Sequence, residues 1–271
     1  GIQFIKSNDK IELNLENYIM KSIKYFELEM AKNREVPITV YEENKIESEA
    51  QVLNEKKLYQ SIVGVLNYIC NAVRYDISYA VNWLARRVNQ ATIYDLKIAK
   101  RTLTYLRDNK DLTIKITPLD LSKEIFITAY VDSSFANSKS RKSICGYIIY
   151  VNDFIIYYKC GKQTLVCLSS TEAEFVALSA CANKVKWIQN IFTELKCKVK
   201  VPIIYSDNQS AIAIAYAKGA KGRTKHLDIK HQHVRELIRT NQIQVKYKET
   251  EENLADVFTK ALSTVRFNKL R

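Results

Sequence analysis

Four acidic side chains stand where predicted strands end or predicted helices begin. They are Asp132, Glu174, Asp207 and Asp256. We place the first and third at the carboxyl ends of β-rich runs, and the second and fourth in the first turns of helices. Binding sites in open α/β sheets form outside the carboxyl ends of the strands. The four acids are therefore expected to meet at one edge of a sheet.

A cluster of carboxylates without histidine or cysteine suits a hard divalent cation. Mg²⁺ takes carboxylate oxygens and keeps several waters. Two such ions, about 3.5–4 Å apart, can stabilise both the attacking and the leaving oxygen when a phosphodiester is cleaved by in-line displacement. Four like charges repel one another, so bound metal is needed to offset them. The pattern predicts metal-dependent phosphodiester hydrolysis.

Each acid also has a structural interpretation. Asp132 precedes two serines and could begin a turn. The spacings Thr171-x-x-Glu174 and Ser169-x-x-Glu172 both fit a capping box, so either glutamate could merely cap the helix. Asp207 could cap the next helix, and Asp256 could favour a helix dipole. The four positions together favour the metal site more than any one of them does.

The elements around these acids predict an α/β domain with a mixed sheet. Three β-rich runs follow one another, and helices and strands then alternate, which places helices on the faces of the sheet. The strands are expected at 124–131, 143–151, 154–160, 201–206 and 243–247, and the helices at 171–196, 210–216, 228–239 and 251–262. A hairpin turn is expected at residues 151–153.

The first part of the chain has a different pattern. Two short strand-like runs at 2–5 and 11–15 precede a helical pattern, and residues 55–110 have helical periodicity. Lysines and arginines alternate there with Tyr94 and Tyr105. This mixture suits either contact with a sugar–phosphate backbone or a solvated helix face.

The composition indicates a polyanionic partner. The 271 residues include 42 Lys and Arg against 29 Asp and Glu, a formal net charge of +13. Neutralisation of phosphates by such side chains is the sequence-independent part of nucleic-acid affinity. The six cysteines form no C-x-x-C pair, which argues against a zinc site, and we interpret them as reduced thiols. There is no signal peptide and no apolar run of 18 residues, so no membrane partner is expected. A chain that begins at Gly1 is expected to be a fragment or a processed product.

Seven segments between residues 129 and 262 resemble, in order, the ribonuclease H domain of copia-type LTR retrotransposons. They are AYVDSSFA (129–136), RKSICGY (141–147), GKQT (161–164), SSTEAEFVAL (169–178), SDNQSAI (206–212), RTKHLDI (223–229) and NLADVFTKAL (253–262). Upstream, residues 59–68 and 74–77 resemble the connection that follows the reverse transcriptase, and the first residues resemble the end of the polymerase.

The resemblance implies three parts within the C-terminal region of a Pol polyprotein. Residues 1–46 correspond to the end of the reverse transcriptase (palm edge and thumb), and residues 47–120 to a helical connection. Residues 121–271 correspond to the ribonuclease H domain. The implied fold is α/β, with a ribonuclease H-like five-stranded mixed sheet and flanking helices, preceded by a mostly helical thumb and connection region.

The resemblance also implies a nuclease site of Asp132, Glu174, Asp207 and Asp256, acting as catalytic residues and ligands of two Mg²⁺ ions, with Mn²⁺ as an alternative. Ribonucleases H carry Glu-x-x-Ala at the second position, which favours Glu174 over the nearby Glu172. They often carry a loop histidine shortly before the last Asp, but residues 246–249 contain none. Proton transfer to the leaving group or product release is then expected to be slower or to use water.

The implied activity is endonucleolytic hydrolysis of the RNA strand of RNA–DNA hybrids during reverse transcription, leaving a 3′-hydroxyl and a 5′-phosphate. The implied partners are the hybrid and the upstream polymerase palm and integrase of the same polyprotein. The expected location is intracellular, in a cytoplasmic virus-like particle or the nucleus. The side chains expected to contact nucleic acid are Ser133, Lys162, Gln163, Asn208, Gln209, Arg223 and Lys225.

Other functions fit the residues less well. The sequence Tyr130-Val-Asp-Ser lacks the second Asp of the polymerase motif Tyr-x-Asp-Asp, and no palm precedes it. Integrases use two Asp and a late Glu, whereas here the Glu comes second. His226, His231 and His233 lie too early to supply the loop histidine, and a Mg²⁺ site needs none of them. The non-enzymatic alternative is a decayed or domesticated retroelement remnant that only binds nucleic acid, against which the four intact acids argue.

Overall fold

The chain is divided into two compact units. The computed structural model describes residues 1–44, 51–54, 56–136, 141–217 and 225–271. The first unit comprises Gly1–Pro118 with Lys260–Lys269 and Arg271, and the second comprises Leu119–Thr259 with Leu270. Within the described ranges, no helix is both long and apolar enough to cross a membrane.

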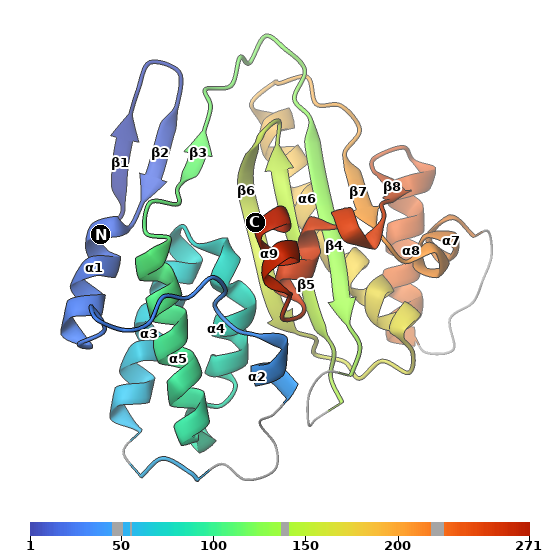
Figure 1. Cartoon of the computed structure of the whole chain (residues 1–271). Coiled ribbons are helices and arrows are strands. Elements are labelled where there is room, and N and C mark those ends of the chain that lie inside the picture. Colours follow the sequence, from blue (N-terminus) through green and yellow to red (C-terminus); the bar gives the residue numbers. More distant parts are fainter. Residues whose placement is uncertain (45–50, 55, 137–140, 218–224) are drawn as a thin grey trace. The chain divides into compact units, whose positions relative to one another are not determined.

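The second unit is built on a five-stranded mixed sheet (Figure 1). Its strands, in the order β6-β5-β4-β7-β8, are Phe154–Lys162, Ile144–Val151, Ile127–Ser134, Ile203–Ser206 and Gln244–Tyr247. The pairs β4–β5 and β5–β6 are antiparallel, whereas β4–β7 and β7–β8 are parallel. The carboxyl ends of β4, β7 and β8 therefore lie at the same edge of the sheet.

The strands form where apolar side chains alternate or run together. In β4, Ile127, Ala129 and Val131 are buried, which fits a strand with one face in the core. The hairpin expected at 151–153 is confirmed: Val151 pairs with Phe154, and Asn152 between them has a positive φ of 49°. Asparagine tolerates this left-handed conformation, which tight hairpin turns require.

Helix α6 (Ser170–Glu194) packs against one face of this sheet, and a short 3₁₀ segment, η4 (Leu254–Phe258), packs against the other. Neighbouring residues on β5 show this, because side chains alternate between the faces of a strand. Tyr147 lies near Cys181 of α6, whereas a side chain at Gly146 would meet Phe258. Helices α7 (Gln209–Tyr216) and α8 (Lys225–Arg239) pack on each other.

Two sequence expectations in this unit were wrong. Residues 251–262 do not form one helix but two 3₁₀ segments, η3 (Thr250–Glu252) and η4, separated by Asn253 in an extended conformation. The Asn253 side chain accepts from the backbone N–H of Ala255 and donates to the carbonyl of Val131 (3.1 Å), which fixes the break. Strand β4 also continues beyond its expected end, to Ser134.

The first unit combines helices with a small antiparallel sheet. The helices are α1 (Glu16–Tyr25), α2 (Val40–Asn44), α3 (Lys57–Ala72), α4 (Ser78–Ala85), α5 (Ile93–Asp108) and α9 (Thr264–Leu270), with 3₁₀ turns η1 (Tyr75–Ile77) and η2 (Val88–Gln90). The strands are β1 (Gln3–Lys6), β2 (Ile11–Asn14) and β3 (Ile114–Ile116). Strand β3, which pairs with β2, was not expected from the sequence.

Candidate active site

Asp132 and Asp207 are brought together by neighbouring parallel strands. Tyr130 on β4 is aligned with Tyr205 on β7, and their rings stack with centroids 5.3 Å apart. Asp132 lies two residues after Tyr130 within β4, and Asp207 lies two residues after Tyr205, directly after the end of β7. The parallel register therefore places both carboxylates at the same sheet edge, as the sequence predicts.

Asp256 reaches this edge because η4 lies very close to β5. Gly146 is paired directly opposite Asp132. A Cβ atom at Gly146 would lie 2.4 Å from Cβ of Phe258 and 3.0 Å from Cγ2 of Thr259. Only glycine leaves room for this approach. One carboxylate oxygen from each of the three aspartates lies within 4.8 Å of the others.

Glu174 enters the same site from α6. Its Oε1 accepts a hydrogen bond from the backbone N–H of Ser133 (3.1 Å). Burial raises the pKa of this carboxyl to about 9, and the negative charges of Asp132 and Asp207 add to the shift. The structure thus brings together all four acids that the sequence singled out.

The neighbouring Glu172 has a different role. Ser169 is the N-cap of α6 and accepts from the backbone N–H of Glu172 (3.1 Å), while the Glu172 carboxylate accepts from Leu168 N–H (2.6 Å). Glu172 therefore satisfies backbone donors at the start of the helix. This arrangement leaves Glu174 as the acid that faces the aspartates.

Two threonines form hydrogen bonds with the aspartates. The Thr259 hydroxyl donates to Oδ2 of Asp132, and the Thr250 hydroxyl donates to Oδ2 of Asp207 (2.8 Å). Sequence reasoning did not assign a role to these threonines or to Gly146. Thr259 and Gly146 lie within motifs that the sequence does show, but only the folded contacts reveal what they do.

The donor set fits a hard divalent cation. It consists of carboxylate oxygens held in a partly buried cluster, where their mutual repulsion requires a counter-charge. In addition, Oε2 of Glu174 is buried and has no hydrogen-bond partner among the described residues. A buried carboxylate oxygen without a partner is costly, and a bound cation would remove that cost.

The side chains expected to contact nucleic acid are placed differently from one another. Lys162 and Gln209 are exposed, and Ser133 is half-buried next to the acids. Asn208 caps α7 by accepting from Ala211 N–H (2.8 Å). Arg223 lies outside the described residues, and Lys225 begins α8, without a described side chain.

Gln163 is committed to contacts within the protein. Its side chain is buried, donates to the carbonyl of Ala173 (2.8 Å) and accepts from the Cys167 thiol (3.2 Å). It therefore braces the beginning of α6, and the expected phosphate contact would require these bonds to break.

The sheet order, the helices on its faces and the acidic cluster at its edge define an α/β domain of the ribonuclease H-like class. One solved structure with a similar fold is LC11-RNase H1 in complex with RNA/DNA hybrid. It is 14% identical, with a TM-score of 0.38, and the match covers 49% of this chain and 93% of that one. No family model matches the chain.

Sequence relatives identify the family. Over 217 residues (79% of the chain), it is 33% identical to the retrovirus-related Pol polyprotein from transposon RE1 of Arabidopsis thaliana. Over 268 residues (97% of the chain), it is 28% identical to the retrovirus-related Pol polyprotein from transposon TNT 1-94 of Nicotiana tabacum. The chain belongs to the copia-type retrotransposon Pol polyproteins. It spans 14% and 20% of the length of these two relatives.

Proposed function

We propose that the second unit hydrolyses the RNA strand of RNA–DNA hybrids and that a divalent cation, Mg²⁺ or Mn²⁺, is required. The main support is that carboxylate oxygens of Asp132, Asp207 and Asp256 lie within 4.8 Å of one another, beside Glu174. This arrangement supplies the ligands that phosphodiester hydrolysis with hard metal ions requires. The family and the fold agree with the proposal.

The four acids would hold two ions, and each protein group has a distinct part in preparing the site. When bound, the ions supply activation of water and stabilisation of negative charge on the phosphate. Thr259 and Thr250 each occupy one oxygen of an aspartate and so restrict the rotation of its carboxylate. The backbone N–H of Ser133 orients Glu174, whose proton must leave before that carboxylate can serve as an ionised ligand.

Selection of RNA would depend on groups beside the acids. A 2′-hydroxyl both donates and accepts hydrogen bonds, and it distinguishes RNA from DNA in the minor groove of a hybrid. Ser133 and Gln209 flank the cluster and are proposed to make these contacts. Asn208 uses its amide oxygen to cap α7, so its amide nitrogen is the group proposed to reach the substrate.

The biological setting is also a proposal. The chain would act together with the polymerase palm and the integrase of a Pol polyprotein, removing RNA from hybrids during reverse transcription. An intracellular particle that contains the polyprotein, or the nucleus, would be the place of action.

The test is a cleavage assay with the purified chain, Mg²⁺ and an RNA–DNA hybrid labelled on each strand in turn. Metal-dependent cleavage of the RNA strand alone is expected, with duplex DNA left intact. The Asp207→Asn variant should lose the activity while it keeps its thermal unfolding midpoint. Binding of the hybrid without cleavage, at several Mg²⁺ and Mn²⁺ concentrations and also after the polymerase palm is added, would contradict the proposal and indicate a nucleic-acid-binding remnant.

A further inference from the structure

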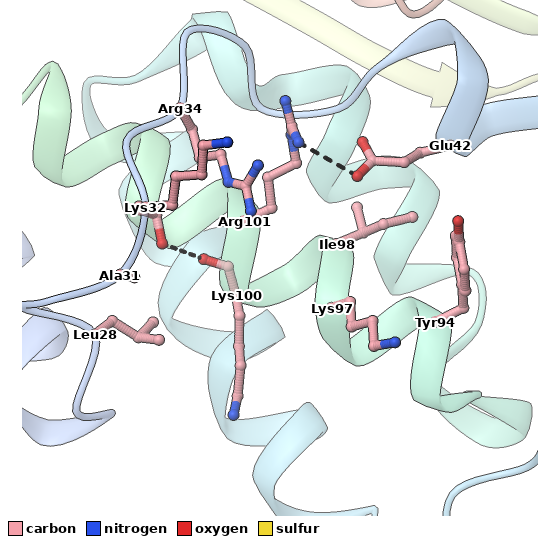
Figure 2. A pocket seen from close by; sticks show the side chains of 11 residues that line it. Leu28, Ala31, Lys32, Arg34, Glu42, Tyr94, Lys97, Ile98, Lys100 and Arg101 are labelled. Carbon is pink, nitrogen blue, oxygen red and sulfur yellow. Dashed lines mark hydrogen bonds and ion pairs between the residues drawn. The ribbon is translucent and has the colours of Figure 1, made fainter.

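A second candidate site lies in the first unit, apart from the acidic cluster. It is a pocket of about 410 Å³ between α5 and the segment 28–42 (Figure 2). This volume falls within the range of roughly 300–1,000 Å³ that small-molecule sites occupy. We call it the α5 pocket.

The α5 pocket is strongly basic. Its cationic lining residues are Lys32, Arg34, Lys97, Lys100 and Arg101. Among the described lining residues, the one carboxylate is that of Glu42. Its Oε2 accepts from the Thr39 backbone N–H (3.0 Å) and hydroxyl (2.7 Å), while its Oε1 lies 3.4 Å from Arg101. Glu42 therefore neutralises only part of the positive charge.

Hydrogen bonds attach the segment that lines the pocket to α5. Arg107 donates to the carbonyls of Leu28 (2.9 Å) and Glu29 (2.7 Å). Asp108 accepts from the backbone N–H of Arg34 (2.6 Å), and Arg101 donates to the carbonyl of Val36 (3.2 Å). The segment 28–36 is thus tied to the helix at several points, which keeps Lys32 and Arg34 beside the cations of α5.

The assembled cations repel one another. Burial lowers the pKa of Arg101; the negative charge of Glu42 opposes this shift, and the positive charge of Arg34 adds to it. Figure 2 shows these two side chains close together at one side of the pocket. An anion bound between them would relieve the repulsion, so the free energy gained on binding would be larger than for isolated surface cations.

The pocket also has an aromatic and apolar side. Tyr94 and Ile98 line it on α5, and Leu28 lines it from the opposite segment. Lys97 Nζ lies 6.0 Å from the centre of the Tyr94 ring. A cation beside an aromatic ring suits one nucleotide, because the cation can contact the phosphate while the base stacks on the ring. Proteins that hold single strands combine these two elements.

We propose that the α5 pocket binds one nucleotide of a single-stranded nucleic acid, with the phosphate among the cations and the base beside Tyr94. A pocket of this size admits one residue of a flexible strand, whereas the paired bases of a duplex cannot enter it. The site is separate from the acidic cluster and does not depend on its metal. It would hold unpaired template or product while the nuclease acts elsewhere on the chain.

The test measures binding of a fluorescently labelled oligo-dT or oligo-U by anisotropy, in EDTA so that metal-dependent binding is absent. The Lys97→Gln/Lys100→Gln variant should bind about tenfold more weakly. The slope of a plot of log K against log [salt] should become less negative by about 0.7 for each phosphate that the variant no longer neutralises. The Lys57→Gln/Lys269→Gln variant removes the same charge from two exposed lysines outside the pocket and should bind like the original chain. Equally weakened binding in both variants, or unchanged binding in the first, would overturn the proposal.

Two further comparisons test the nucleotide assignment. Tyr94→Ala should weaken binding of the single strand and Tyr94→Phe should not, because stacking needs the ring and not the hydroxyl. Replacement of the two lysines should weaken single-strand binding more than duplex binding. Equal effects on both, or inorganic phosphate competing as well as the oligonucleotide does, would overturn the single-strand assignment. Thermal midpoints confirm that each variant is folded. Cleavage of a hybrid is assayed separately, so failure of the nuclease proposal leaves this result interpretable.

Discussion

Folding strongly alters the protonation of Glu174. Burial and the neighbouring aspartates raise its pKa from an ordinary value of 4.5 to about 9. The protonated carboxyl therefore favours the folded state fully below pH 4.5, and this advantage is lost as the pH rises toward 9, because the unfolded chain is ionised there. We expect the thermal unfolding midpoint, measured in EDTA, to fall across this range.

The Glu174→Gln variant provides the control. It keeps the shape of the side chain without a titrating group, so the fall in its midpoint should be smaller. Mg²⁺ should raise the midpoint of the original chain more at high pH than at low pH, since the ion requires the carboxylate. An equally steep fall for the glutamine variant would assign the titration to another group.

Thr259 acts on the site through its hydroxyl. The side chain is fully buried and donates to Asp132. The Thr259→Val variant keeps the shape but leaves the carboxylate without this donor, whereas Thr259→Ser keeps the donor. Residues that support metal ligands typically contribute 10- to 100-fold to affinity or activity. We expect a weakening of this size in Mg²⁺ binding by calorimetry for the valine variant, and recovery of most of it by serine; equal affinities would argue against the role.

The sequence predicts the positions of the acids but not the residues that hydrogen-bond to them, and the reason is physical. Asp132 and Asp207 follow apolar runs, so the local pattern alone places them near the carboxyl ends of their strands. Thr259 contacts a residue 127 positions earlier in the chain. No local periodicity encodes such a contact. The same limit applies to Gln163, because the sequence around it does not indicate its buried hydrogen bond to Ala173 of α6.

At the scale of elements, the approach of η4 to β5 determines where Asp256 lies. An added methyl at Gly146 would lie 2.4 Å from Cβ of Phe258, which is fixed to the backbone and cannot turn aside. Overpacking of this kind costs roughly 1–3 kcal/mol. We expect Gly146→Ala to lower the free energy of unfolding by about that amount and to reduce Mg²⁺-dependent cleavage, since η4 must shift.

Gly64 offers a matched control. It lies within α3, and nothing stands within 4 Å of its potential Cβ. Glycine is unfavourable within a helix by roughly 0.5–1 kcal/mol relative to alanine. The Gly64→Ala substitution should therefore stabilise the chain in urea unfolding and leave cleavage unchanged. If Gly146→Ala behaves in the same way as this control, the close approach does not constrain the site.

The elements that were predicted best are those with a strong local signal. The long α6 has an apolar stripe and an N-cap serine, and its expected range of 171–196 is close to the observed helix. The expected helix at 251–262 failed because Asn253 forms bonds that compete with helical ones. Strand β3 has three residues and pairs with β2, about a hundred positions earlier in the chain. No sequence pattern next to it therefore predicts a strand.

At the scale of the whole molecule, the chain does not divide at one point in its sequence. Residues 260–269 and Arg271 belong to the first unit, although they follow the residues of the second. Phe267 is buried and meets the Tyr105 ring edge-on at 5.8 Å, and Arg271 donates to the Tyr105 hydroxyl (2.8 Å). The same hydroxyl donates to Asp76 (2.6 Å), which forms a buried ion pair with Arg74. The end of the chain thus completes the polar core of the first unit.

Removal of this packing should destabilise the first unit selectively. Truncation of a buried Phe to Ala typically costs 3–5 kcal/mol, because the apolar packing of the ring is removed and a cavity remains. We expect Phe267→Ala to increase amide hydrogen exchange in α5, where Tyr105 lies, while β4 and β5 keep their protection. Val265→Ala, at a residue that is 82% exposed on the same helix, should change neither. An equal fall in the protection of β4 would mean that the two units unfold together. In that case the buried packing of Phe267 would stabilise the five-stranded sheet as well as the helices of the first unit.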